Sequence, residues 1–226
     1  MIVKGLLICF TGIDGAGKTT LSKELVKSLE KHGIGCKYVY ARLNPFISRP
    51  VMSIGRLLFL SGREIESKGY LKYYVMKRAA IKHHSTLSGI YVKILLIDFL
   101  LQIFFKVKIP LKLGKNIICD RYVYDTIITD ISVHMNYSVE KIINLINSLL
   151  RFIPKPNITF LLDVPEEVAY RRKTDIPSVE YLKEKRWIYL DVGKRCEMIL
   201  IDGCKPLEEL KTLTQNKVLE YLREYG

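Results

Sequence analysis

The stretch with the clearest chemical pattern runs from residue 10 to residue 20, Phe-Thr-Gly-Ile-Asp-Gly-Ala-Gly-Lys-Thr-Thr. It contains Gly-x4-Gly-Lys-Thr, the spacing of a loop that binds phosphate groups. Its glycines let the backbone turn so that several N–H groups point inward toward an anion. Lys18 can then reach the β- and γ-phosphates of a nucleoside triphosphate, and the hydroxyl of Thr19 can bind Mg²⁺.

The residues on both sides of this loop predict the elements that must position it. The apolar run over residues 6–10 is typical of a buried strand, and apolar residues recur at helical spacing between Leu21 and Leu29. A helix N-terminus after a glycine-rich loop favours an anion, because the helix dipole adds positive potential there. The residues expected to bind the triphosphate are Gly12, Ile13, Asp14, Gly15, Ala16, Gly17, Lys18, Thr19 and Thr20.

A second charged pair follows another short apolar run, at residues 116–119. This run predicts a buried strand that ends at Asp120, and Arg121 and Tyr122 follow at once. In phosphate-loop proteins an Asp at the end of a neighbouring strand usually holds Mg²⁺, directly or through water. Arg121 would then lie at the same sheet edge, where its guanidinium could bind a second phosphate group. The alternative is a strand that ends in an ordinary surface Asp–Arg pair.

Two further groups of residues could complete such a site. Arg171 and Arg172 begin a polar segment, so that residues 171–180 could form a basic lid over transferring phosphates. Tyr74 and Arg78 are four residues apart in a predicted helix, so that one face could stack a base and hydrogen-bond its edge. The alternatives are a charged, solvated helix end for the arginines and an ordinary amphipathic helix for the Tyr–Arg pair.

The order of the predicted elements indicates the fold class. After the first strand, apolar runs at residues 36–40, 116–120, 158–163 and 199–203 predict four more strands, with helical patterns between them. Strands that alternate with helices form parallel sheets with right-handed crossovers. We therefore expect an α/β protein with a three-layer P-loop NTPase fold, in which helices and a short basic lid flank a five-stranded parallel sheet. We expect one domain over residues 1–226.

The composition limits the kind of partner and compartment. The chain has 226 residues and a formal net charge of +13, which suits an anionic partner but also an ordinary lysine-rich surface. The cations are spread along the chain instead of gathering in one arm, which disfavours nucleic acid. The five cysteines show no pairing pattern, and the N-terminal apolar run leads directly into the phosphate loop. These features favour a reducing, cytoplasmic location.

One apolar stretch stands apart from the sheet pattern. Residues 90–105 are nearly all apolar, with Lys93, Asp98 and Gln102 as interruptions. A membrane-spanning helix needs about 20 apolar residues, so this shorter, charged stretch is not expected to cross a bilayer. A buried core helix or a homodimer interface is the favoured interpretation. A peripheral membrane contact, supported by nearby lysines, is the less favoured one.

The order of these motifs resembles that of the thymidylate kinase family over nearly the whole chain. The family opens with Phe-x-Gly-x-Asp/Glu-Gly-x-Gly-Lys-Thr/Ser-Thr, which residues 10–20 match. A strand of the family ends in Asp-Arg-Tyr/His, as at residues 120–122, and a later one in Leu-Asp-x-Pro, as at residues 162–165. A basic lid and a Tyr-Leu pair follow in both. The resemblance implies transfer of the γ-phosphoryl group of ATP, with Mg²⁺, to dTMP.

The resemblance also implies roles for matching residues. Asp14 lies where the family's loop carboxylate contacts the acceptor sugar, and Arg121 matches the arginine that holds the acceptor phosphate. Ala16 leaves the loop without an arginine, so a lid arginine would have to come from the lid itself. The implied catalytic residues are Lys18, Asp14, Arg121, Arg171 and Arg172, and the implied Mg²⁺ ligands are Thr19 and Asp120. The implied acceptor-binding residues are Asp14, Arg42, Tyr74, Arg78, Arg121 and Asp130.

Two positions depart from the family's pattern near the acceptor. Arg42 is the candidate for the arginine of an Arg-Glu-Pro motif that is otherwise absent, and Asp130 stands where the family often has Gln or Thr. The acceptor could therefore be another nucleoside monophosphate or a deoxynucleoside. A nucleotide-dependent nucleic-acid-binding protein is the less favoured alternative. The expected partners are small-molecule nucleotides and a second copy of the chain, without nucleic acid or membrane.

Overall fold

The computed structural model of the protein describes residues 5–46, 48–49, 85–132, 135, 137–173 and 175–225. Its parallel strands form one five-stranded sheet in the order β2-β3-β1-β4-β5. The strands are β1 (Leu7–Gly12), β2 (Cys36–Tyr40), β3 (Asn116–Asp120), β4 (Ile158–Asp163) and β5 (Ile199–Asp202). The predicted α/β class and all five predicted strands are confirmed, since each apolar run forms a strand at its expected place.

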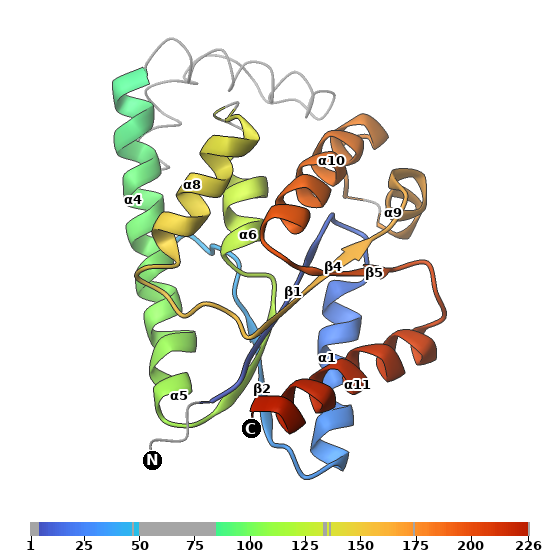
Figure 1. The fold of residues 1–226 in the computed structure, drawn as a ribbon. Helices are drawn as coiled ribbons and strands as arrows, with labels where there is room; N and C mark the ends of the chain where they lie inside the picture. The colour runs from blue at the N-terminus through green and yellow to red at the C-terminus, as the bar shows by residue number, and fades with distance from the viewer. Residues whose placement is uncertain are drawn as a thin grey trace.

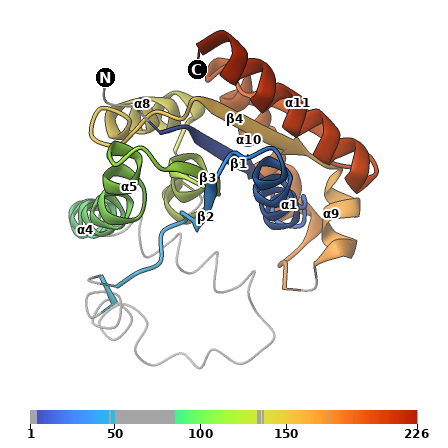
Figure 2. The same ribbon diagram turned by 90° about the horizontal axis from the view of Figure 1, so that it is seen from below.

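Helices cover both faces of this sheet (Figures 1 and 2). The described helical elements are α1 (Lys18–Lys31), α4 (Ser85–Ile103), η1 (Phe104–Lys108), α5 (Ile109–Lys112), α6 (Val123–Asp125), η2 (Thr126–Ser132), α8 (Val139–Leu149), α9 (Glu166–Arg172), α10 (Val179–Arg195) and α11 (Leu207–Tyr225). The pair α1 and α11 packs on one face, and α4, α5, α8 and α10 lie on the other. The elements η1 and η2 are π-helical turns.

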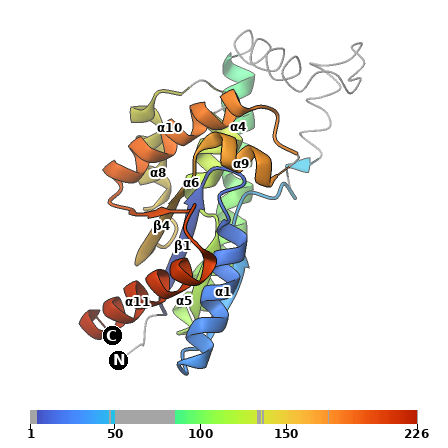
Figure 3. The ribbon, with the colours of Figure 1, turned by 90° about the vertical axis from the view of Figure 1, so that its right-hand side faces the viewer.

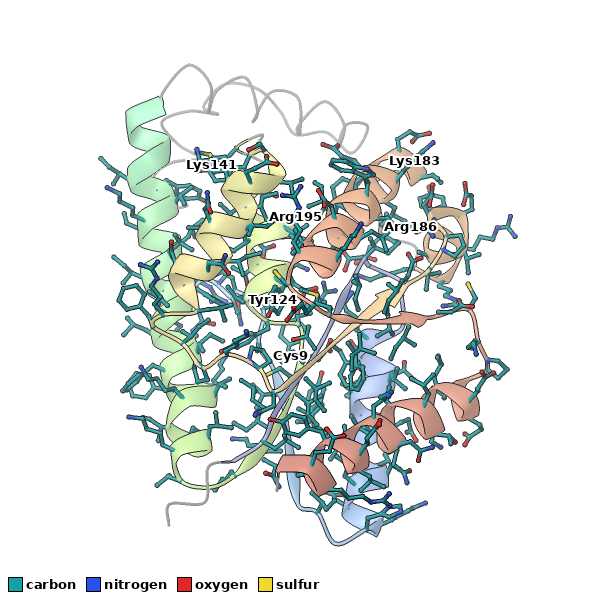
Figure 4. All side chains as sticks on the ribbon, viewed as in Figure 1. Cys9, Tyr124, Lys141, Lys183, Arg186 and Arg195 are labelled. Atoms are coloured by element: carbon teal, nitrogen blue, oxygen red, sulfur yellow. The ribbon has the colours of Figure 1, made fainter. Side chains whose placement is uncertain are left out.

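The central strand of the sheet is apolar because both of its faces are covered. All six residues of β1 are buried, and Cys9 of this strand lies opposite Cys119 of β3. Figure 4 shows Cys9 in the interior of the molecule, near Tyr124. Because the strands are parallel, their carboxyl ends meet at one edge, where open α/β sheets bind their ligands. In Figure 3 that edge carries the turn from β1 into α1, with α9 and α10 beside it.

The apolar helix α4 is only half buried. Val92, Leu95, Phe99 and Ile103 belong to the core, whereas Ile90, Ile97 and Leu101 are exposed. The predicted core helix is therefore confirmed for one face. Among the residues that the structure describes, no helix has the length and the apolar character needed to cross a membrane.

The charged residue inside α4 has a structural explanation. Asp98 is 2% exposed and accepts hydrogen bonds from the backbone N–H groups of Phe46 and Ser48, at 2.8 and 3.0 Å. The hydroxyl of Ser48 donates to the same oxygen at 2.8 Å. These donors lower the pKa of Asp98 even though burial raises it. The carboxylate thus fixes the chain that follows β2 against α4.

Candidate functional site

At two positions of the loop between β1 and α1, the backbone has a conformation that only glycine can adopt without strain. Gly12 and Gly15 have φ angles of 137° and 86°. A Cβ atom at Gly12 would lie 2.4 Å from the carbonyl oxygen of Leu162, and one at Gly15 would lie 2.3 Å from that of Ala169 in α9. Both positions therefore require glycine for their conformation and for the close approach of a neighbouring backbone. The predicted phosphate-loop geometry is present.

Lys18 lies folded against this loop. Its side chain is buried, and its Nζ donates to the carbonyl oxygens of Gly12 and Ile13, both at 2.7 Å. Burial lowers the pKa of Lys18 to about 8, and the nearby charge of Arg121 acts in the same direction. Among the described residues no carboxylate lies within salt-bridge distance of this ammonium group. A bound phosphate would supply the missing anion.

Thr19 and Asp120, which the sequence assigned to a metal, lie in contact. The Thr19 hydroxyl and the Tyr38 hydroxyl both donate to Oδ2 of Asp120, at 2.5 and 2.9 Å. The other carboxylate oxygen, Oδ1, is buried and has no hydrogen-bond partner among the described residues. Buried polar atoms are normally satisfied, and hydroxyl and carboxylate oxygens are the donors that Mg²⁺ prefers. These residues therefore fit a magnesium ion.

Arg121 is held beside the loop by an unusual backbone. Its φ angle is 69°, in the left-handed region that side chains rarely adopt and that occurs preferentially at functional sites. Its N–H donates to the carbonyl oxygen of Phe10 at 2.9 Å, which fixes the residue at the carboxyl end of β1. The guanidinium contacts Asp14 of the loop, and lies 3.5 Å from Asp125. Asp120 and Arg121 are 0% and 8% exposed, so the alternative of a surface pair is wrong.

Two carboxylates share the charge of Arg121 but have opposite pKa shifts. Burial raises the pKa of Asp14, yet the charges of Arg121 and Lys18 outweigh it and hold that pKa well below its usual range. Asp125 is completely buried, and burial raises its pKa despite the same cations. Asp125 also accepts hydrogen bonds from Thr11 at 2.8 Å and from Tyr189 at 3.0 Å. It therefore connects β1, α6 and α10 directly beneath the loop.

Arg42 and Asp130 form a paired unit at the same edge. Nε of Arg42 lies 3.0 Å from each oxygen of Asp130, and Nη2 lies 2.5 Å from Oδ1. Asp130 belongs to η2, and π-helical turns often occur at functional sites. The hydrogen bonds and the charge of Asp130 raise the pKa of Arg42, although burial acts against them. The structure thus brings two expected acceptor residues together as an ion pair.

Lys185 is a cation of this edge that the sequence did not single out. It comes from α10, is 1% exposed, and donates a hydrogen bond to the Tyr181 hydroxyl while its Nζ lies 4.1 Å from the centre of that ring. Burial lowers the pKa of Lys185 to about 7. The charges of Asp14 and Asp130 raise it, and those of two arginines of the site lower it. Lys185 therefore lies within the same electrostatic cluster.

The segment that carries the expected lid arginines contacts the loop through α9. Arg172 donates to the carbonyl oxygen of Gly203 at 3.0 Å, and Arg171 is exposed. A Cβ atom at Gly203 would lie 3.2 Å from the carbonyl oxygen of Ala16, so the turn after β5 also lies against the loop. The two arginines therefore lie near the phosphate loop, at the end of the helix that packs on it.

Arg186 fixes α10 relative to these elements (Figure 4). Its guanidinium donates to both oxygens of Asp163, at 2.6 and 2.9 Å, and to Glu166 at 2.8 Å. Asp163 ends β4 and Glu166 begins α9, so one side chain joins three elements.

Tyr74 and Arg78, the expected base-binding pair, lie outside the described residues. Asp125, Tyr38 and Lys185 are site residues that sequence reasoning missed.

Comparison with known proteins identifies the family. A family model described as thymidylate kinase matches residues 72–213 of the chain. A probable thymidylate kinase from Methanocaldococcus jannaschii is 28% identical over 227 residues, covering 98% of each chain. A thymidylate kinase from Onion yellows phytoplasma is 27% identical over 95% of this chain and 97% of its own. A probable thymidylate kinase from Sulfurisphaera tokodaii is 29% identical over 92% of each. The chain belongs to the thymidylate kinase family.

Proposed function

We propose that this protein transfers the γ-phosphoryl group of ATP to dTMP, with ADP and dTDP as products. The observation that carries the proposal is the contact between Arg121 and Asp14. It joins a cation suited to an acceptor phosphate to the loop suited to a donor triphosphate, at one edge of the sheet. Two nucleotides bound there could meet with their phosphate ends facing each other, as in-line transfer requires.

On the donor side, the loop amides over residues 12–20 would bind the phosphates of ATP. Lys18 would leave the carbonyl oxygens it now contacts and bind the transferring group. Thr19 and Asp120 would hold Mg²⁺, for which the unsatisfied Oδ1 of Asp120 is available. The metal supplies positive charge that neutralises the phosphates as the bond breaks. Arg171 or Arg172 would add a further cation from the lid.

On the acceptor side, Arg121 would hold the phosphate of dTMP in line, and Asp14 would orient the sugar. A phosphate monoester loses its second proton near pH 6, so the attacking oxygen is already ionised at pH 7 and needs no strong base. The lowered pKa of Asp14 agrees with a role in orienting the sugar and not in removing a proton. A carboxylate with a low pKa accepts hydrogen bonds well but removes protons poorly. The further acceptor-binding residues in this proposal are Arg42, Tyr74, Arg78 and Asp130.

We extend the proposal to the organisation of the protein. The chain would form one domain over residues 1–226, with a lid at about residues 171–180, and would work in the cytoplasm without a nucleic-acid partner. The exposed apolar face of α4 and η1 supports a homodimer, because such a surface favours burial against a second copy. That face comprises Ile90, Ile97, Leu101, Phe104 and Phe105. A monomeric mass at micromolar concentration would contradict the dimer.

A substrate panel tests the proposed reaction. ADP release would be measured with ATP and Mg²⁺ and each of dTMP, dUMP, dCMP, dAMP, dGMP, the four ribonucleoside monophosphates and thymidine. We expect dTMP to give the highest kcat/KM and thymidine to give no turnover above background. No acceleration by any monophosphate would overturn the kinase proposal. Preference for another monophosphate would retain the reaction and replace the acceptor.

Preference for thymidine would support the alternative of a deoxynucleoside kinase. A nucleoside hydroxyl must lose a proton, so that reaction needs a general base at the acceptor. Of the two carboxylates considered for that base, Asp14 is bound to Arg121, and Asp120 receives two hydroxyl donors and is assigned to Mg²⁺ in this proposal. Neither is a free base in this arrangement, which supports the monophosphate acceptor.

A further inference from the structure

The cations around the acceptor side are not equivalent. The guanidinium of Arg121 is shared by Asp14 and Asp125, and that of Arg42 is bound to Asp130. Both arginines therefore already have carboxylate partners. In contrast, no carboxylate of the described residues lies within salt-bridge distance of Lys185.

Lys185 is nevertheless enclosed. It is 1% exposed, and its ammonium group donates a hydrogen bond to the hydroxyl of Tyr181, one turn earlier in α10. A hydroxyl and the face of an aromatic ring solvate an ammonium group less well than water does, so the buried charge is costly. A packed apolar side chain of similar length would avoid that cost. A lysine at such a position is explained if the charge is used when a ligand arrives.

The charges around Lys185 indicate which ligand this is. The titratable groups that act on it come from the phosphate loop, the end of β2, the end of β3 and η2, namely Asp14, Arg42, Arg121 and Asp130. These are residues of the acceptor side. These four groups comprise two cations and two carboxylates, so that without Lys185 they carry no net positive charge. A dianionic phosphate entering this surrounding needs one more cation.

We propose that Lys185 is an acceptor-binding residue whose ammonium group donates to a phosphate oxygen of the acceptor nucleotide, beside Arg121. This inference rests on the proposed function, because it requires that a nucleoside monophosphate bind at this edge. In the absence of acceptor, the amino group of Lys185 stays on the hydroxyl of Tyr181. When the acceptor binds, the phosphate takes the place of the carboxylate that Lys185 lacks.

The first test compares Lys185→Met with Lys183→Met. Lys183 is exposed on the same helix and serves as the matched control (Figure 4). We expect Lys185→Met to raise the KM for dTMP about 10- to 100-fold, the range for one charge-assisted hydrogen bond, with the KM for ATP within about twofold. Lys183→Met should leave both values unchanged. An unchanged KM for dTMP in an active Lys185→Met protein would overturn the inference.

The stability of the unliganded variants separates this role from a merely structural one. Since the folded pKa of Lys185 is lowered to about 7, the unfolded chain binds more protons than the folded one between about pH 7 and pH 10. The buried charge of Lys185 therefore lowers the stability of the folded protein by its whole amount below about pH 7, and this loss of stability decreases as the pH rises. We expect Lys185→Met to raise the melting temperature at pH 6.5 and to raise it less at pH 9. A lower melting temperature at pH 6.5 would indicate a structural role.

Proton uptake provides a measurement that needs no variant. At pH 8 the acceptor phosphate is fully ionised, and Lys185 of the free protein is mostly neutral. Binding dTMP should then take up close to one proton, seen by calorimetry in two buffers of different ionisation enthalpy. Lys18 also titrates in this range, so the part of the uptake that disappears in Lys185→Met is the part assigned to Lys185. Wild-type binding without proton uptake would overturn the inference.

The outcomes also distinguish this inference from the proposed function. If the wild-type protein phosphorylates no monophosphate, the proposed function fails and the inference fails with it. If it phosphorylates a monophosphate other than dTMP, the same measurements apply to that acceptor. If turnover is normal and Lys185→Met matches Lys183→Met, only the assignment of Lys185 fails.

Discussion

The donor and acceptor sides of this sheet edge are built in different ways. The donor side is made from backbone: Gly12 and Gly15 in positive-φ conformations, and a lysine held on carbonyl oxygens only five and six residues away. The acceptor side is made from charged side chains that come from separate elements. Asp130 pairs with Arg42 across 88 residues, and Asp14 contacts Arg121 across 107.

This difference teaches how each side can fail. A backbone site depends on shape, so that a single methyl group in the wrong place can distort it. A cluster of paired charges tolerates small changes of shape but depends on its charge balance, because removing one partner leaves the other buried without compensation. Substitutions that change shape and substitutions that change charge should therefore have separable effects on the two substrates.

The largest effect is expected from Lys18→Met, which removes the ammonium group that donates to two carbonyl oxygens of the donor loop. We expect kcat to fall about 10³-fold or more, as when an electrostatic donor to a transition state is lost. Stability should not fall, because the variant removes a buried ammonium whose pKa burial lowers to about 8. Steady-state kinetics and thermal unfolding check both points. A decrease in kcat below tenfold would place the critical charge elsewhere.

The next effect is expected from Arg121→Met, which breaks the charge balance of the acceptor side. We expect kcat/KM for dTMP to fall about 10²- to 10³-fold, while the dissociation constant of ATP changes by less than about fivefold. Asp14 and Asp125 lose their partner, so the free energy of unfolding should fall by about 3 kcal/mol.

A surface variant controls for the loss of an arginine. Arg195→Met removes a guanidinium that is paired with Asp191 on the exposed side of α10 (Figure 4). Its effect on either substrate should be negligible, and its effect on stability should be below about 1 kcal/mol. Equal losses in the two variants would mean that Arg121 acts only through stability.

Gly15→Ala tests the backbone side by shape alone. The new Cβ atom would lie 2.3 Å from a backbone oxygen of α9, so the loop or the helix must move. We expect the KM for ATP to rise about 10- to 100-fold and the KM for dTMP to change much less. Gly33→Ala is the matched control, because φ at Gly33 is 75° but no atom lies within 4 Å of the added carbon. If both variants lose ATP affinity equally, backbone strain and not loop shape is the cause.

The smallest effect is expected from Asp130→Asn, which keeps the shape of the Arg42 pair and removes its negative charge. We expect the KM for dTMP to rise about fivefold, the cost of weakening one hydrogen-bonded contact, with no change for ATP. Initial rates at varied dTMP provide the measurement. A KM for dTMP that is unchanged or lower would show that Asp130 restrains Arg42 and does not contact the acceptor.

The same contrast explains what could be predicted from the sequence. The loop, its strand and helix, and the strand-end residues Asp120 and Arg121 are local patterns, so spacing alone located them. The partnership of Arg42 with Asp130 is not local, and nothing at either position indicates the other. Nothing in the sequence distinguishes Lys185 from the other cations of its helix, because a charged residue on a helix is usually solvated.

The burial of individual residues is the second property that the sequence could not show. Asp125 follows Arg121 by one helical turn and could have been an exposed residue, yet it is completely buried beneath the loop. The apolar stretch of α4 is apolar on all sides, so its pattern could not show which face enters the core. Asp98 in that stretch was an interruption in the sequence and is a backbone anchor in the structure.

The contact between Gly15 and Ala169 has a mechanical consequence. Because the backbone of α9 touches the loop without a side chain between them, that helix cannot slide without carrying the loop with it. The hydrogen bond from Arg172 to Gly203 ties the end of the helix a second time. If the proposed lid moves, its hinge would lie after residue 172, so that Arg171 and Arg172, at the lid's first residues, would keep their place beside the loop while the rest of the lid moves.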